Sequence, residues 1–466
     1  MNSLTRFNYE AFPFPFYAVL VSRSGERVQE AYFAPCTKDS LHRMFSITKS
    51  FTALAVTALA AEGRISLHDP IIRYFPDFTP SDPHPYLSEM TIQDLLDMKT
   101  CHESTTYKLD LSENWVRSFF VTPPGHRSGQ VFKYDTSAAH TLAALVKRVS
   151  GEGILDYLRP IYLNGIGFSR SAYVLSDPFG DEIGGSGLLA RCEDIMVTAE
   201  FLLSLYQGDF ASRYSFLFHD SYDEAFFNRY SSLVKECMSF KSPTLHEGKT
   251  LEECQGYGSQ FWMIRNGFMM YGMGGQYAAF FPEENLIIVT AADTQSIQGG
   301  TQIILDEMNR IDTTLRSEKG KSALPFTLPH RPKRTQNTPA LKDVLSLLSG
   351  SYRILPNPNG FQRCTVSESE VSLKTGEHTF RFPITPGQPA ETTDPKYHQT
   401  LYVHTSPLED GSLYQYTEVY DSYLGNIRIL LHGDGSHLTI YLRKAEESLF
   451  SEFAGFLEAV KEEPLP

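Results

Sequence analysis

The chain has 466 residues, about three times the most common domain length, which predicts roughly two or three domains with sizeable cores. Hydrophobic residues make up 41% and charged residues 21%, which excludes a disordered or collagen-like chain. The formal net charge of −14 repels phosphate backbones and anionic membranes, so nucleic acid is not an expected partner.

Two features of the sequence bear on the compartment of the protein. The apolar residues 12–20 are interrupted by Pro13 and Pro15 and precede no small-residue cleavage site, and no run approaches the roughly 20 apolar residues of a membrane helix. The six cysteines, which are Cys36, Cys101, Cys192, Cys237, Cys254 and Cys364, form no CxxC pair. We therefore expect a soluble, cytoplasmic protein without a membrane span, whose cysteines are free thiols.

The first predicted elements are a hairpin and a long helix. Strand-like runs over 16–21 and 28–33 flank a turn at 24–26, which predicts the hairpin. From Ser46 to Ala61 apolar residues recur at helical spacing, and Gly63 follows as a C-terminal stop. Ser46 therefore opens the predicted helix.

Shorter elements follow up to residue 314. Thr91 and Asp94 have the spacing of a capping box, which predicts a short helix over 91–98. The later elements are, in chain order, a glycine-rich turn region over 165–187, a helix over 195–206, a buried strand over 286–290 and a helix over 301–311. We predict that all of these elements form one domain over 1–314.

The C-terminal part of the chain has a different pattern. Residues 315–339 contain four prolines and little apolar periodicity, which predicts a linker. Short strand-like runs follow at 351–355, 370–374, 379–382, 401–404, 415–420, 427–431 and 438–442, and Asp434-Gly435 predicts a primed hairpin turn between the last two. We therefore predict a β-rich accessory domain over 340–466 that is an antiparallel barrel or sandwich.

Ser46-Ile47-Thr48-Lys49 is an S-x-x-K sequence at the start of the long predicted helix. The three-residue step places the lysine amine on the same helix face as the serine hydroxyl. A serine hydroxyl is a weak nucleophile until a neighbour takes its proton, and a partly buried lysine can have its pKa lowered enough to do so. The motif alone is weak evidence, because Ser232 to Lys235 fits it as well.

The sequence around this motif resembles a known superfamily. The matching segments are, in order, Met44 to Gly63, Arg64 to Ile71, Tyr74-Phe75-Pro76, Met90 to Leu96, Tyr134-Asp135-Thr136, Gly184 to Leu188, Tyr257-Gly258 opening a strand, and Gly272 to Gln276. This succession resembles the serine β-lactamase and penicillin-binding-protein-like superfamily, in its branch of class C β-lactamases, D-peptidases and family VIII esterases. The resemblance covers about residues 16–311 and implies an α/β (α+β) fold, with an antiparallel sheet flanked by helices and a helical subdomain.

The resemblance implies a role for each matching residue. Ser46 would be the acylated nucleophile, Lys49 its proton acceptor, and Tyr134 the residue that shares the base role and returns the proton to the leaving group. Gly274 and Gly275 would keep the backbone open for a close approach. The backbone N–H of Gln276, or of the residue beside it, would form an oxyanion hole with that of Ser46.

Two substrate-binding positions depart from the pattern of the superfamily. Thr136 stands where the superfamily has asparagine, and threonine lacks the amide donor that holds the substrate carbonyl and orients the lysine. Met273 stands where the superfamily has lysine or histidine, and methionine carries no charge for a substrate carboxylate. Because methionine offers an apolar wall, we predict a preference for neutral esters or amides over carboxylate-bearing β-lactams.

The sequence thus predicts a serine hydrolase that forms an acyl-enzyme on an ester, amide or D-amino-acid peptide bond, and its expected partner is that small-molecule substrate. No cofactor and no metal is expected, because the histidines are dispersed without an HExxH sequence. Two alternatives stay open. The first is a weakened or inactive protein of the same fold that binds a peptide or cell-wall fragment, and the second is an enzyme that transfers the acyl group to an acceptor other than water. The oligomeric state is not determined by the sequence.

Overall fold

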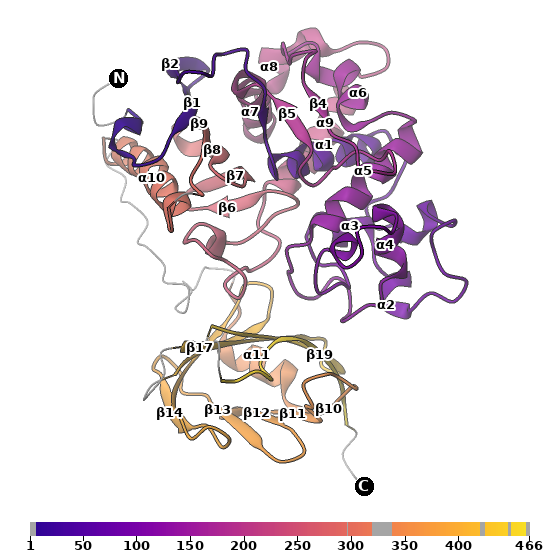
Figure 1. Cartoon of the computed structure of the whole chain (residues 1–466), viewed down its shortest axis with the longest axis vertical. Coiled ribbons are helices and arrows are strands. Elements are labelled where there is room, and N and C mark those ends of the chain that lie inside the picture. The colour runs from indigo at the N-terminus through magenta and orange to yellow at the C-terminus, as the bar shows by residue number, and fades with distance from the viewer. Residues whose placement is uncertain (1–5, 296, 319–337, 420–424, 446–448, 463–466) are drawn as a thin grey trace.

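The computed structural model of the chain describes residues 6–295, 297–318, 338–419, 425–445 and 449–462. Two large sheets organise these residues: a six-stranded sheet within residues 16–292 and a ten-stranded sheet within residues 350–461 (Figure 1). All strand pairs in both sheets are antiparallel, and helices flank the first sheet. The predicted fold class is therefore confirmed.

We call residues 6–318 the first part of the chain. The six-stranded sheet pairs strands from the beginning of this part with strands from near its end. Its strands are, in spatial order, β2 (Glu26–Tyr32), β1 (Phe16–Arg23), β9 (Leu286–Ala292), β8 (Gln276–Phe281), β7 (Gly267–Gly272) and β6 (Trp262–Ile264). The predicted hairpin is β1 with β2, and the predicted buried strand is β9, all of whose residues are buried. Because β1 pairs with β9, residues far apart in the sequence share one core.

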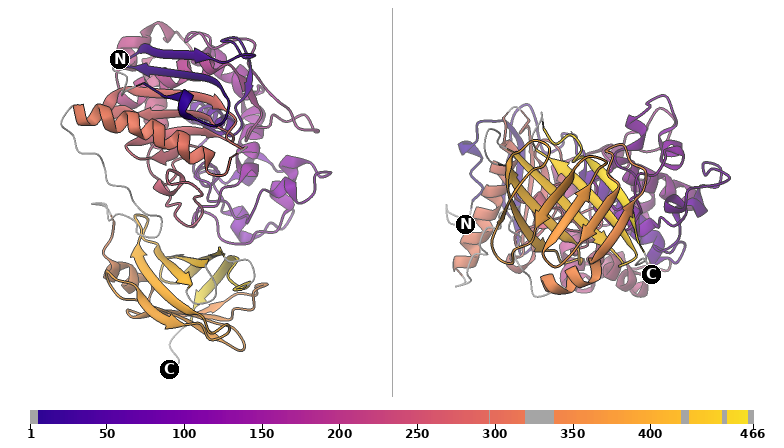
Figure 2. Two further views of the ribbon diagram at one scale, coloured as in Figure 1. Left: turned by 60° about the vertical axis from the view of Figure 1, so that its left-hand side comes forward. Right: turned by 90° about the horizontal axis from the view of Figure 1, so that it is seen from below.

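Helices cover both faces of this sheet. Helix α7 (Cys192–Gln207) contacts β1, β8 and β9 on one face, and α10 (Gly300–Glu318) lies on the other (Figures 1 and 2). These helices and α1 (Ile47–Ala61) confirm the helices predicted at 195–206, 301–311 and 46–61. The remaining α-helices of this part are α2 (Pro85–Ser88), α3 (Ile92–Leu96), α4 (Trp115–Val121), α5 (Thr136–Ser150), α6 (Ile154–Leu158), α8 (Phe210–Tyr214) and α9 (Glu224–Cys237).

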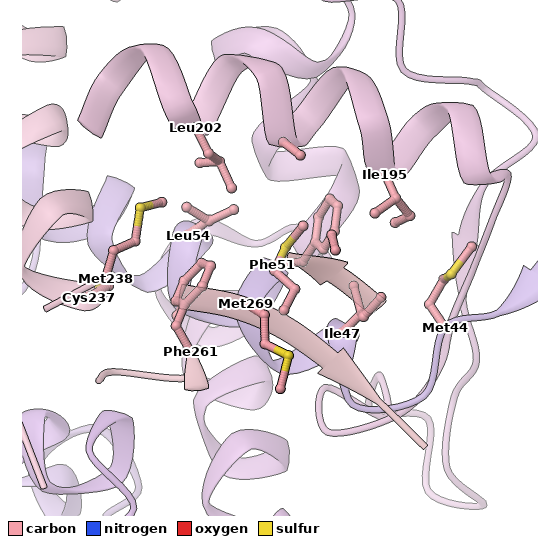
Figure 3. Close-up of a cluster of buried hydrophobic side chains, with 14 of the residues drawn as sticks. Met44, Ile47, Phe51, Leu54, Ile195, Leu202, Cys237, Met238, Phe261 and Met269 are labelled. Atoms are coloured by element: carbon pink, nitrogen blue, oxygen red, sulfur yellow. The ribbon is translucent and has the colours of Figure 1, made fainter. Parts of the chain in front are cut away.

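Helix α1 is enclosed on all sides by other elements. It contacts α5, α9 and β7, and all of its residues except Ala60 are buried. Figure 3 shows Ile47, Phe51 and Leu54 of α1 packed among side chains of α7, α9 and the sheet. Burial of this kind stabilises by about 1.5–3 kcal/mol for each large apolar side chain, so the position of the helix, and of the serine at its start, is fixed by the core.

Several short elements complete this part of the fold. Thr91 and Asp94 form the predicted capping box, in which the Thr91 N–H donates to the Asp94 carboxylate over 2.8 Å, although α3 ends at Leu96. A small sheet of β3 (His42–Arg43), β5 (Leu188–Ala190) and β4 (Tyr173–Val174) leads the chain into Ser46. Single helical turns lie at Tyr9–Ala11, Ile71–Tyr74, Thr106–Lys108, Arg159–Leu163, Ser215–Leu217, Glu253–Gln255 and Pro282–Glu284.

The ten-stranded sheet curls into a nearly closed barrel (Figure 2). Its strands are, in spatial order, β13 (Thr379–Pro383), β12 (Glu370–Lys374), β11 (Arg363–Val366), β10 (Gly350–Ile354), β19 (Gly455–Lys461), β18 (His437–Lys444), β17 (Gly425–Gly433), β16 (Leu413–Val419), β15 (Thr400–Pro407) and β14 (Ala390–Thr393). The first and last strands of this order contact each other. Helix α11 (Leu341–Leu348) buries Val344, Leu345 and Leu348 in the barrel core.

The structure corrects several expectations for the tail. Strands β11, β14 and β19 and helix α11 were not predicted. In β19, Leu457, Glu458 and Ala459 favour a helix, but pairing with β10 and β18 on both sides overrides that preference. The turn between β17 and β18 is centred on Gly435 and Ser436, one residue later than predicted, with a positive φ of 89° at Gly435 alone.

The predicted linker begins too early in the sequence. Helix α10 continues to Glu318, because Leu315 and Arg316 are buried and Arg316 pairs with Asp312 over 3.0 Å. Residues 319–337 of the predicted linker lie outside the described residues. The division into 1–314, 315–339 and 340–466 stays a prediction.

Among the described helices, none is both long and apolar enough to span a membrane, and all six cysteines are free.

Candidate active site

The chain enters α1 through a strained turn. Phe45 has a φ of +46°, a left-handed conformation that costs a non-glycine residue about 1–3 kcal/mol. The turn is held by β5, because Met44 N–H donates to the Leu188 carbonyl over 2.8 Å and Leu188 N–H donates to the Thr48 hydroxyl over 3.0 Å. Ser46 is left partly exposed at the N-terminus of α1, where the first backbone N–H groups have no acceptor within the helix.

The hydroxyl of Ser46 is engaged by the amine of Lys49. Although Ser46 is the N-cap residue of α1, its side chain makes no capping hydrogen bond, and its Oγ lies 3.1 Å from Lys49 Nζ. The Lys49 side chain is buried, and its amine also contacts the Gly185 carbonyl at 2.7 Å and the Thr136 hydroxyl at 3.4 Å. The structure thus brings Ser46, Lys49 and Thr136 together, and the glycine-rich turn at 184–187 supplies a backbone acceptor for the lysine.

The buried position of Lys49 changes its acidity. Burial lowers the pKa of Lys49 to about 7; the carboxylate of Asp135 opposes this change and the exposed Lys108 adds to it. At neutral pH a large fraction of the Lys49 amine is therefore uncharged, 3.1 Å from a hydroxyl. An uncharged amine at this distance can accept the serine proton.

Asp135 also belongs to the site, although the sequence alone predicts no role for it. It is the N-cap of α5 and fully buried, and its carboxylate accepts hydrogen bonds from Ser137 N–H over 2.8 Å and from the Thr100 hydroxyl over 3.3 Å. Burial raises its pKa to about 6 although these hydrogen bonds oppose the change. An aspartate before Thr-Ser-Ala-Ala is a recognisable N-cap signal, but its effect on Lys49 depends on packing.

Tyr134 is a further residue next to the Ser46 hydroxyl. Burial raises the pKa of the Tyr134 phenol far above the ordinary value, although the interaction with the Ser46 side chain opposes this change. The Lys49 amine lies 4.9 Å from the centre of the Tyr134 ring. Tyr134 is therefore protonated at neutral pH and suited to give a proton, whereas Lys49 is suited to take one.

An aromatic wall stands behind Tyr134. The Trp262 ring stacks on it with centroids 5.7 Å apart, and the Tyr257 ring meets it edge-on at 6.2 Å. Trp262 was not predicted as a site residue, because only the fold brings β6 beside Tyr134. The expected strand at Tyr257-Gly258 starts later, at Trp262, and Tyr257 makes only isolated bridges to Ser242 and Trp262.

The turn between β7 and β8 lies close to the start of α1. A Cβ on Gly272 would come 2.3 Å from the Met44 carbonyl, so the backbone of β7 touches the residue two positions before Ser46. Gly274 and Gly275 have φ values of +84° and +103°, and a Cβ at Gly275 would also press on Ala292 at 2.9 Å. Both glycines are therefore required by the turn itself.

The other two predicted residues of this turn have different environments. The Gln276 side chain is buried, and its amide donates to the carbonyls of Ala292 over 2.8 Å and Met273 over 3.4 Å, which ties the turn to β9. The Met273 side chain is 49% exposed. Met273 therefore presents its side chain to solvent from this turn. Within the described residues, no group of three histidine, cysteine, aspartate or glutamate side chains could hold a metal ion.

The N-terminal part of this chain is similar to known proteins. A family model described as Beta-lactamase matches residues 13–165. Protein flp of Staphylococcus aureus (strain COL) is 26% identical over 166 residues, which cover 33% of this chain and 32% of that protein. The 6-aminohexanoate-dimer hydrolase of Paenarthrobacter ureafaciens is 25% identical over 201 residues, which cover 40% of this chain and 51% of that protein. The matched part of this chain thus spans about a third and about half of the two relatives.

A solved structure supports the fold over a longer stretch. A Bacillus anthracis protein described with the name 6-aminohexanoate-dimer hydrolase matches with a TM-score of 0.50 and 19% identity, over 66% of this chain and 80% of that chain. At this identity the likeness shows the fold alone. Residues 13–165 thus match the Beta-lactamase family model, and the order of the motifs is consistent with the superfamily of serine β-lactamases and penicillin-binding-protein-like proteins.

Proposed function

We propose that this protein is a serine hydrolase that forms an acyl-enzyme at Ser46 on an ester, amide or D-amino-acid peptide bond. The observation that carries the proposal is the buried Lys49 amine, with a pKa of about 7, lying 3.1 Å from the Ser46 hydroxyl. A lysine paired only for stability would be expected to keep its charge and an acidic partner. One matched relative is named as a hydrolase, which supports the same class of reaction.

In the proposed reaction, Lys49 and Tyr134 relay a proton from the Ser46 hydroxyl to the leaving group. Ser46 Oγ attacks the substrate carbonyl carbon while its proton passes to Lys49 Nζ. The negative charge on the carbonyl oxygen is stabilised by the backbone N–H of Ser46 and by a second N–H from the β7–β8 turn, for which Gln276 stays the candidate. Tyr134 protonates the leaving group and regains its proton from Lys49, and water then repeats the sequence on the acyl ester.

The two departures from the superfamily pattern define the proposed substrate. The Thr136 hydroxyl is 3.4 Å from Lys49 Nζ, so it can help to orient the lysine although it offers no amide to the substrate. The exposed side chain of Met273, which we place at the rim of the site, brings no positive charge there. We therefore propose a small neutral ester or amide as the substrate, in a cytoplasmic protein.

The chain contains a matched control for the test of this proposal. Ser232-x-x-Lys235 is the other S-x-x-K sequence, and Ser232 is exposed on α9. Hydrolysis of a short-chain p-nitrophenyl ester is measured for the wild type, Ser46→Ala and Ser232→Ala. We expect the Ser46 variant to lose activity by about 10²-fold or more and the Ser232 variant to match the wild type. An inactive wild type would favour the alternative of a protein that binds a peptide or cell-wall fragment without turnover.

A further inference from the structure

The outer face of the barrel carries a continuous apolar row. Tyr414, Leu430, Tyr441 and Phe456 lie directly opposite one another on the neighbouring strands β16, β17, β18 and β19. Their sequence neighbours point into the barrel core, so the row faces outward. All four side chains are nevertheless buried, because Val131 and Leu245 of the first part of the chain pack on them. The barrel is therefore docked on the part that carries Ser46.

One side of this contact is the segment that leads into Tyr134. The His126 ring stacks on Phe456 with centroids 3.7 Å apart, and Arg127 N–H donates to the Glu458 carboxyl over 3.1 Å. The Lys133 amine donates to Glu247 over 2.8 Å and to the Tyr441 hydroxyl over 3.3 Å. Because Tyr134 follows Lys133 directly, the barrel holds the chain up to the residue that contacts Ser46.

The other side of the contact is the segment 244–254. Arg443 on β18 donates to the carbonyls of His246 over 2.9 Å and Glu247 over 3.1 Å. The Tyr441 hydroxyl donates to the Glu247 carboxylate. This segment continues to Tyr257 and Trp262, whose rings contact Tyr134. The Tyr441 hydroxyl therefore lies where the two segments that place Tyr134 and its aromatic wall meet.

We propose that Tyr441 is a positioning residue for Tyr134. It acts through Lys133 and Glu247 and touches no reacting atom, and the inference rests on the proposed function because that function gives Tyr134 its role in proton transfer. A misplacement of about 1 Å at a proton-transferring group can cost about 10²-fold in rate. The barrel therefore helps to place an active-site residue, although no side chain in its described part is seen to contact Ser46.

The row supplies a matched pair of variants for the test. Tyr441→Phe removes the bridging hydroxyl and keeps the ring in the row. Tyr414→Phe removes a hydroxyl that is equally buried but has no partner among the described residues. With the full-length protein and a neutral p-nitrophenyl ester, we expect kcat of the Tyr441 variant to fall about tenfold at an unchanged KM, with kcat of the Tyr414 variant at the wild-type value.

A second pair tests the same bridge from its other end. Glu247→Gln keeps an acceptor for the Tyr441 hydroxyl, whereas Glu247→Ala removes it, so we expect the glutamine variant to retain more of the wild-type kcat. Equal kcat values for the two phenylalanine variants, or a change in KM alone, would overturn the inference and leave the proposed function standing. A wild type that hydrolyses no ester and forms no covalent adduct would overturn both.

Discussion

Lys49 Nζ and Ser46 Oγ lie 3.1 Å apart at the start of a helix that is buried along its whole length except at Ala60. Helical spacing brings the amine to the hydroxyl, and burial of the helix lowers the pKa of that amine to about 7. Both properties follow from one element. The same packing that fixes α1 in the core therefore also prepares the lysine to take a proton.

The first prediction concerns the pH dependence of activity. Below a pH of about 7 the Lys49 amine is protonated and cannot accept the serine proton, so kcat/KM for a neutral ester should rise with pH through an apparent pKa near 7. Asp135→Asn removes the carboxylate that raises the pKa of Lys49 and keeps a side chain that can cap α5. That variant should shift the midpoint to lower pH. A shift to higher pH, or a wild-type profile without an ionisation near neutrality, would contradict the role of Lys49.

The second prediction concerns the charge of the substrate. Met273→Lys adds a cation at an exposed rim position, and a charge-assisted hydrogen bond of about 1.5–3 kcal/mol should raise kcat/KM for a carboxylate-bearing cephalosporin by about tenfold or more. Met273→Gln, which has a similar length and no charge, is the control and should leave the preference for the neutral ester unchanged.

Efficient cephalosporin turnover by the wild type would show that the carboxylate is bound by another cation. Lys108 is the candidate, because it is exposed and its charge acts on Lys49. Lys108→Ala would then abolish the turnover of the cephalosporin and spare the turnover of the ester.

The third prediction concerns the stability of the barrel contact. Burial raises the pKa of Glu458 to about 7, although hydrogen bonds from Thr439 and Arg127 oppose the change. The folded state thus binds this proton more tightly than the unfolded state, whose carboxyl has the ordinary value of 4.5. The stabilisation is complete below that value and is lost as the pH rises through about 7. Tm should fall over this range in the wild type and fall less in Glu458→Gln; equal slopes would exclude Glu458 as the cause.

The fourth prediction concerns the independence of the two parts of the chain. The proline-rich composition of residues 319–337 predicts limited proteolysis there, since α10 protects the residues up to Glu318. Because the row at Tyr414, Leu430, Tyr441 and Phe456 is buried in the contact, the two fragments should elute together in size-exclusion chromatography. Separate elution of two folded fragments would contradict the docked arrangement.

Local patterns in the sequence predicted individual elements, whereas the arrangement of the first sheet and its helices was implied by the family resemblance. Such local patterns are the 3.6-residue apolar period of α1, the capping box at Thr91, and the alternation of apolar and polar residues in β12 and β18. Strand β19 carries the opposite signal, because Leu457, Glu458 and Ala459 favour a helix and only pairing with β10 and β18 makes them a strand. Such pairing is a tertiary effect that a local pattern cannot contain.

The residues of the candidate site also fall into two groups, those that a sequence pattern identifies and those that only the fold brings together. Spacing and motif order bring out Ser46, Lys49 and Tyr134, and the structure places their side chains around one hydroxyl. The sequence offers no comparable signal for Trp262 or Tyr441, which reach the neighbourhood of Tyr134 from a late strand and from the barrel. The acidity of Lys49 depends on the packing around α1, which no motif specifies.

The central claim is that Ser46 is a nucleophile, and its most direct test is intact-mass spectrometry after incubation with a fluorophosphonate. We predict that the wild type and Ser232→Ala each gain the mass of one adduct, that peptide mapping places it on Ser46, and that Ser46→Ala gains none. Lys49→Ala should acquire the adduct much more slowly, because no amine takes the proton. An unmodified wild type, or the same adduct on Ser46→Ala, would contradict the account.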